Sequence, residues 1–141
     1  MFMDKDVLES ITGEIQSLPC VFEKTVLAVR CQCSLAQKIF VAEREGLQCT
    51  VAQAHERCDK IVALVRDKTS FTFGLPSAEQ ALPHRKRMRL QAGLLSALAL
   101  DLYGDETIAH LDINALLAAA MQHYQNIENF PVTQIMRTIA N

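Results

Sequence analysis

Apolar residues recur every three or four positions along most of the chain, the spacing that gathers them on one face of an α-helix. Most of these segments end at a proline, a glycine or a polar cluster, which are residues that stop helices. Helices are expected over residues 4–18, 21–30, 34–46, 50–70, 83–104, 112–127 and 132–139. We therefore predict an all-α fold, a single helical domain over residues 1–141 built as an irregular bundle of about six helices.

Residues 21–30 fit two structures, and the rest of the chain decides between them. Phe22, Val26 and Val29 follow a helical seam, but β-branched residues also suit an extended segment. The only other strand-like run in the sequence is TSFTF at 69–73, and an isolated pair of strands is barely stable. A helix is therefore favoured for 21–30.

Two short stretches share a sequence pattern and a predicted role. QCSLAQ at 32–37 and QCTVAQ at 48–53 are identical at four of six positions. In each, a hydroxyl residue is followed three positions later by a glutamine, the capping-box pattern in which each side chain bonds the backbone amide of the other residue. Both stretches are predicted to open a helix, at Ser34 and at Thr50, with a cysteine just before the cap.

The first stretch raises a geometric question, because one residue separates Cys31 from Cys33. On a continuous helix, residues two positions apart point in different directions, so these two thiols would not reach one metal ion. A cap at Ser34 lets the helix begin after Cys33, and residues before a cap need not be helical. We therefore expect the chain to leave helical geometry near residue 32.

Cysteines are the main candidates for chemistry, since four of the five fall within residues 31–58. Thiolates bind zinc and iron–sulfur clusters, and helix N-termini favour their anionic form. The sequence lacks the paired CxxC knuckles usual in structural zinc sites, so an iron–sulfur cluster is the first expectation and zinc the alternative. The predicted metal ligands are Cys31, Cys33, Cys49 and Cys58, with Cys20 or His55 as substitutes.

Two other interpretations of these cysteines stay open. In the first, the cysteines bind no metal and only fill the hydrophobic core. Cys58 continues the apolar seam of its helix, and free cysteine is often buried in protein cores. A regular helix from residue 51 would also carry Cys58 roughly 10 Å along the axis, which is far for ligands of one zinc ion. In the second interpretation, Cys31 or Cys33 pairs reversibly with Cys49 as a thiol redox switch.

Composition and charge indicate which classes of partner and which cellular compartment to expect. The chain has 141 residues, of which 50% are hydrophobic, and a net charge of −2, which argues against general binding of polyanions. The first eighteen residues do not follow the pattern of a signal peptide, and no apolar run reaches the roughly 18–20 residues of a membrane span. An odd number of cysteines without an export signal suits a reducing compartment. A cytoplasmic protein is expected.

The run HRKRMR at 84–89 places several cations at the start of a predicted helix, where they oppose the helix dipole. This placement points to an anionic partner, and an acidic protein surface is the first expectation. Nucleic acid is disfavoured because no aromatic residues for base stacking are interleaved with the charges. A solvated helix face is the structural alternative. The residues concerned are His84, Arg85, Lys86, Arg87 and Arg89.

These observations lead to one functional expectation and a rival. The expectation is a cytoplasmic helical protein that binds an iron–sulfur cluster, or another thiolate-bound metal, for electron transfer, sensing or accessory assembly. The rival is a metal-free interaction module with core cysteines, which packs on another chain or forms a homo-oligomer. The sequence has no glycine-rich phosphate loop, GxSxG or HExxH motif, so an enzyme is not the expectation.

Overall fold

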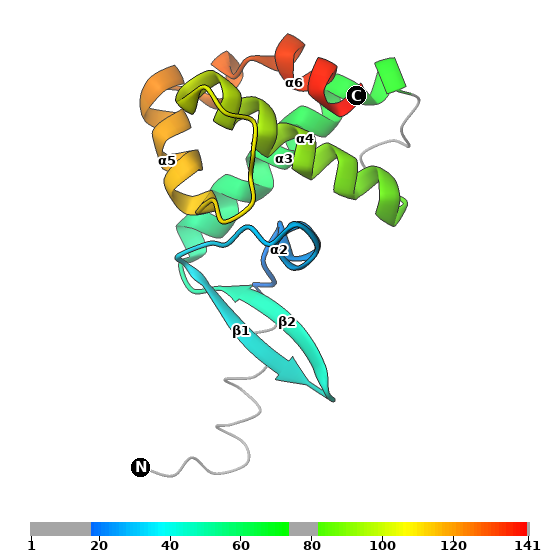
Figure 1. Ribbon diagram of the computed structural model, residues 1–141, viewed down its shortest axis with the longest axis vertical. Coiled ribbons are helices and arrows are strands. Elements are labelled where there is room, and N and C mark those ends of the chain that lie inside the picture. Colours follow the sequence, from blue (N-terminus) through cyan, green and yellow to red (C-terminus); the bar gives the residue numbers. More distant parts are fainter. Residues whose placement is uncertain (1–17, 74–81, 141) are drawn as a thin grey trace.

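The computed structural model describes residues 18–73 and 82–140, in which five α-helices are accompanied by one β-hairpin (Figure 1). Most of the helices lie at one end of the molecule, the hairpin projects from the other, and the short helix that begins at residue 23 lies between them (Figure 1). The expected mainly helical domain is confirmed, with the hairpin as an addition. The elements are α2 (Glu23–Val29), β1 (Ala36–Val41), β2 (Arg44–Cys49), α3 (Ala52–Phe73), α4 (His84–Tyr103), α5 (Ile113–Tyr124), the 3-10 helix η1 (Ile127–Asn129) and α6 (Val132–Ala140).

Helix α4 supplies the centre of the hydrophobic core. Its apolar seam includes Leu94, Leu95 and Leu98, which have no exposed surface, and α5 and α6 pack against it. A Cβ atom at Gly93 would lie 2.6 Å from Cγ1 of Ile139, so the close approach of α6 to α4 requires a glycine. Strong local periodicity of this kind explains why the predicted helices at 50–70, 83–104, 112–127 and 132–139 are confirmed with small shifts in their ends.

The helix expected over 34–46 is wrong, because this part of the chain forms the β-hairpin. β1 pairs with β2 in antiparallel register, from Ala36 opposite Cys49 to Val41 opposite Arg44. The turn residues Ala42 and Glu43 both have positive φ, 51° and 69°, as a two-residue hairpin turn of type I′ requires. Tertiary pairing here outweighs the weak helical pattern of the segment.

The hairpin is not an isolated strand pair, so the low stability of isolated pairs does not prevent strands from forming here. Residues 18–20 pair with the outer edge of β2 through an antiparallel bridge between Pro19 and Gln48. Helix α2 packs on β2, and the amide of Leu47 donates to a carboxylate oxygen of Glu23 at 3.2 Å. β2 therefore has partners on both edges and a buried side chain at Leu47.

The segment with the two neighbouring cysteines is extended, as the sequence predicted. Helix α2 ends at Val29, and Arg30 follows in the left-handed region with φ of 61°. Gln32 then forms a parallel bridge with Asp112: its amide donates to the carbonyl of Leu111 at 2.8 Å, and its carbonyl accepts from the amide of Ile113 at 2.7 Å. The segment is thereby fixed to the start of α5.

The two predicted capping boxes are replaced by other contacts. The amide of Ser34 donates to Oδ1 of Asp112 at 2.7 Å, so Ser34 starts a turn into β1 and not a helix. The hydroxyl of Thr50 donates to the carbonyl of Leu35 at 2.7 Å, so the two similar stretches contact each other. The helix at 21–30 is confirmed as α2, and the helix expected over 4–18 lies outside the described residues.

Candidate metal centre

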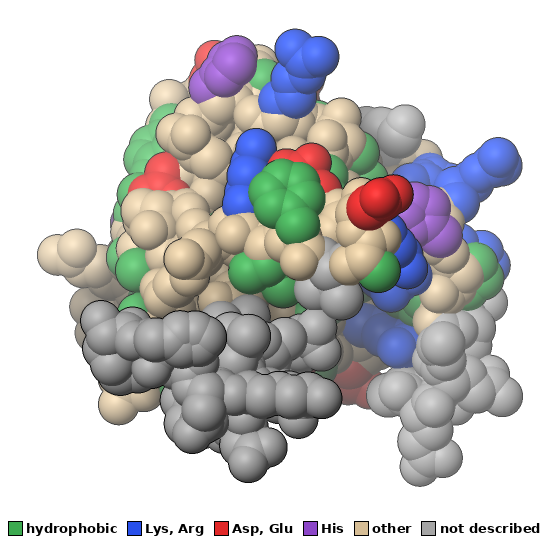
Figure 2. All heavy atoms as spheres, turned by 90° about the horizontal axis from the view of Figure 1, so that it is seen from below, with side chains coloured by type: hydrophobic (Ala, Val, Ile, Leu, Met, Phe, Trp, Pro, Cys, Tyr) green, Lys and Arg blue, Asp and Glu red, His purple; other side chains and the backbone are tan. Residues whose placement is uncertain are grey.

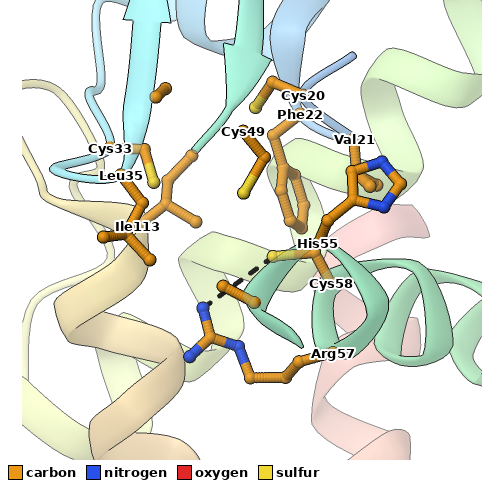
Figure 3. Close-up of a pocket in the computed structure, with 12 residues that line it drawn as sticks. Cys20, Val21, Phe22, Cys33, Leu35, Cys49, His55, Arg57, Cys58 and Ile113 are labelled. Atoms are coloured by element: carbon orange, nitrogen blue, oxygen red, sulfur yellow. Dashed lines mark hydrogen bonds between the residues drawn. The ribbon is translucent and has the colours of Figure 1, made fainter. Parts of the chain in front are cut away.

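Four cysteines from four different segments line one small enclosed cavity between the hairpin, α3 and α5. Figure 3 shows the sulfur atoms of Cys20, Cys33, Cys49 and Cys58 directed into this space. The cavity has a volume of about 20 Å³, which is room for one water-sized particle. We refer to it as the cysteine cavity.

The sheet register brings Cys20 and Cys49 together. The amide of Cys20 donates to the carbonyl of Leu47 at 3.0 Å, and the amide of Cys49 donates to the carbonyl of Leu18 at 2.8 Å. Residues opposite each other in an antiparallel pair share a sheet face, so Cys20 and Cys49 are diagonal neighbours on one face. Cys20, a substitute in the sequence-based ligand set, thus lines the cavity.

Cys33 and Cys58 reach the cavity from the other sides. Cys33 follows the extended segment that is bonded to α5, and its carbonyl accepts from the amide of Ala36 at 3.0 Å as the chain turns into β1. Cys58 lies on α3, at about the end of the second helical turn. Contacts between segments distant in the sequence therefore position Cys20, Cys33 and Cys49, and α3 positions Cys58.

Cys31 lies elsewhere, although the sequence analysis placed it first among the ligands. It is 4% exposed and belongs to the main hydrophobic cluster, outside the lining of the cysteine cavity. His55, the second substitute, does line the cavity, and its Nε2 is 3.0 Å from the carbonyl oxygen of Pro19. That contact links α3 to the strand that carries Cys20.

Burial raises the pKa of three of the five cysteines, Cys20 and Cys58 in the cavity lining and Cys31 in the core. It raises the pKa of Cys20 to about 12, and repulsion from the neighbouring cysteines adds to the shift. Burial also raises the pKa of Cys58, although the hydrogen bond and the positive charge of Arg57 act in the opposite direction. Burial raises the pKa of Cys31 in the core as well. Cys20 in particular is protonated at neutral pH unless a cation replaces its proton.

Arg57 is the charged member of the cavity lining that sequence reasoning missed. Its guanidinium donates to Oδ1 of Asn114 on α5 at 3.0 Å and lies 3.9 Å from the sulfur of Cys58, as the dashed line in Figure 3 marks. Its Nε is buried and has no hydrogen-bond partner among the described residues, and no described carboxylate forms an ion pair with it. A partly buried guanidinium next to the Cys58 thiol, with no described acid as its partner, is suited to an anionic form of that thiol.

The side chains as they stand do not form a finished coordination sphere. Among residues 18–73 and 82–140, no three His, Cys, Asp or Glu side chains lie close enough together to hold one metal ion. Zinc–sulfur bonds are about 2.3 Å long, so the four thiols would have to turn further into the cavity. Rotation about χ1 of a cysteine moves its sulfur without moving the backbone.

The basic run begins α4 and divides into two parts. Arg89 donates to the carbonyl oxygens of Ile139 at 2.9 Å and Ala140 at 3.2 Å, so it caps the end of α6. The other four side chains are exposed and form no ion pair within the described part of the chain: His84, Arg85, Lys86 and Arg87. In Figure 2, Lys and Arg side chains project beside a His at the right-hand edge, the side on which α4 begins in Figure 1.

Comparisons with known proteins leave the family open: no family model, curated protein or solved structure matches this chain. None of the helices within the described ranges is both long and apolar enough to span a bilayer. The described cysteines are all free.

Proposed function

We propose that this protein holds one zinc ion in the cysteine cavity, with Cys20, Cys33, Cys49 and Cys58 as its ligands. The observation that carries the proposal is the convergence of four thiols and one partly unpaired guanidinium on a single enclosed cavity. A zinc ion bound by four thiolates has a net charge of −2, and Arg57 would offset part of it. Without an anion, the buried Nε of Arg57 is an unexplained cost.

The size of the cavity favours a single ion over the iron–sulfur cluster that the sequence suggested. A volume of about 20 Å³ accommodates one particle the size of a water molecule. A cluster with several irons and bridging sulfides would require the hairpin to move away from α3 and α5. The cluster remains the alternative that metal analysis distinguishes.

The role that follows is a zinc-stabilised interaction module that works in the cytoplasm. Zinc has no redox chemistry of its own, so its contribution would be to join the strand at 18–20, the hairpin, the extended segment and α3. Structural zinc contributes directly to folding free energy because the site does not exist in the unfolded chain. This combines the metal-binding expectation with its rival, a helical adaptor.

The test is purification under anaerobic conditions, followed by metal analysis and an absorption spectrum. We expect about one zinc per chain and no visible chromophore. Replacement of Cys33 and Cys49 together by serine should abolish zinc binding. Serine at Cys31, which lies outside the cavity, is the matched control and should retain zinc. A brown chromophore would replace zinc by a cluster, and a metal-free protein with native stability would favour the rival.

The exposed start of α4 supplies the docking surface of this module. His84, Arg85, Lys86 and Arg87 are exposed cationic or ionisable groups without described acidic partners, which suits an acidic protein surface. Replacement of Arg85 and Arg87 by glutamate should weaken binding to an acidic partner, because like charges repel. Added salt should weaken binding of the wild-type protein, because salt screens exposed charges. Binding that ignores both changes would remove this surface from the proposal.

A further inference from the structure

A second, open cavity meets the cysteine cavity at Cys33. This groove has a volume of about 440 Å³ and lies between α2 and the hairpin. Cys33 and Ala36 line both spaces, whereas Cys20, Cys49 and Cys58 line only the enclosed one. Cys33 is therefore the one cysteine of the proposed site that also faces the groove, and Cys31, which is outside that site, lines the groove as well.

The walls of the groove combine apolar surface with a net positive charge. Leu27 of α2 and Leu47 of β2 supply apolar surface. Lys38 also lines the groove, but its ammonium pairs with a carboxylate of Glu45 at 3.1 Å. Arg30 is exposed, lines the same space and forms no ion pair within residues 18–73 and 82–140. One positive charge is thus left at the groove, which favours an anionic occupant.

Resting on the zinc site proposed above, we infer that the groove admits zinc carried by a small thiol with free carboxylates, of the glutathione class, and that Cys33 accepts the ion first. Three observations support this route: the groove is larger than a hydrated ion needs, its unpaired charge matches a carboxylate, and it ends at a thiol of the proposed site. Cys20, Cys49 and Cys58, which line the enclosed cavity but not the groove, complete the coordination.

The transfer is a ligand exchange without change of oxidation state. The bond between zinc and the sulfur of the carrier breaks as a bond between zinc and the sulfur of Cys33 forms. The proton of the Cys33 thiol passes to the departing carrier thiolate. Exchange at the remaining cysteines repeats this step while carrier thiolates remain on the ion, and a thiol that displaces bound water instead releases its proton to solvent.

Leu27 and Leu100 provide a matched pair of variants for the test. Both leucines are 38% exposed, but Leu27 lines the groove and Leu100 lies on α4, outside its lining. The full-length metal-free protein is mixed with zinc–glutathione or with zinc sulfate, and zinc uptake over time is measured by rapid desalting and metal analysis. We expect Leu27→Trp to slow uptake from zinc–glutathione by about fivefold or more, and Leu100→Trp to leave it unchanged.

Arg30→Gln is the second variant, which does not fill the groove. It should slow uptake from zinc–glutathione roughly two- to fivefold at low salt, and leave uptake from zinc sulfate and the equilibrium zinc affinity unchanged. Arg137→Gln on α6, at the opposite end of the molecule in Figure 1, is its control.

The outcomes separate the route from the site. Wild-type rates in both Leu27→Trp and Arg30→Gln would overturn the groove route while zinc binding stands. Equal slowing with zinc sulfate would also overturn it, because the effect would not depend on the carrier. A wild-type chain that takes up no zinc from either source would overturn the proposed function itself.

Discussion

Arg57 gives the cysteine cavity its charge, and its removal tests whether the thiols bind as anions. Arg57→Gln keeps a side chain that can bond Asn114 but removes the positive charge near Cys58. We expect the zinc dissociation constant to rise roughly 10- to 100-fold, as for other groups that support metal ligands. Competition with a chromophoric chelator measures the constant.

Lys60→Gln is the control for this change in net charge. Lys60 lies on the same helix, is exposed, and pairs at 2.9 Å with Glu56. Its loss should leave zinc affinity near the wild-type value, since exposed charges are screened. Equal affinities in the Arg57 and Lys60 variants would mean that the guanidinium does not stabilise a metal–thiolate centre.

The raised pKa of Cys20 makes stability depend on pH in opposite directions with and without zinc. In the metal-free protein the folded-state pKa is about 12 and the ordinary value is 9.0, so the folded chain holds this proton more tightly than the unfolded chain. Its contribution to stability is complete below about pH 9 and is lost as the pH rises toward 12. Zinc instead requires the thiolate, so zinc affinity should weaken by roughly tenfold per unit of falling pH for each proton displaced.

Thermal melts of the two forms across this pH range check both signs. A metal-free protein that gains stability between pH 9 and 12 would contradict the burial of Cys20. Zinc affinity that does not change between neutral and mildly acidic pH would mean that thiols are not the ligands.

At the scale of single elements, the hairpin turn offers a direct test of strand against helix. Ala42 and Glu43 adopt positive φ, which costs roughly 1 kcal/mol or more for such residues and which asparagine and glycine tolerate far better. The double change Ala42→Asn and Glu43→Gly should therefore raise the melting temperature by several degrees. In the helix that the sequence pattern favours for 34–46, the same glycine would lower it.

The elements that sequence reasoning found are those whose pattern is local. The seam of α4 repeats every three or four residues over five turns, so its position follows from the sequence alone. The hairpin depends on residues 18–20, which bond to residues 47–49 of β2, at least 27 positions later in the sequence. A capping-box pattern spans four residues and carries no information about a strand so far away. For this reason the prediction that Ser34 and Thr50 cap two helices was wrong.

At the scale of the whole molecule, the cysteine site was only partly predictable for the same reason. Clustering in the sequence identified Cys33, Cys49 and Cys58, but it favoured Cys31 over the more distant Cys20. The contact that positions Arg57 joins it to Asn114, 57 residues later, and no local signal marks it. An arginine next to a predicted ligand cysteine is the one hint that the sequence contains.

The positions of the four cysteines predict how the whole protein responds to loss of zinc. Cys20, Cys33 and Cys49 lie at the hairpin end of the molecule, whereas the fully buried leucines of α4 form a core that the proposed ligands contact only from its edge. Chelation should therefore increase amide hydrogen exchange in the hairpin, residues 36–49, by at least about tenfold and leave α4 protected, because the hairpin has few buried side chains, whereas Phe22 and Thr25 hold α2 against the core. Mass spectrometry of peptides from the zinc-loaded and chelated forms measures the difference. Equal loss of protection in the hairpin and in α4 would mean that zinc supports the entire core. Unchanged exchange at 36–49 would mean that zinc does not hold the hairpin to the rest of the protein.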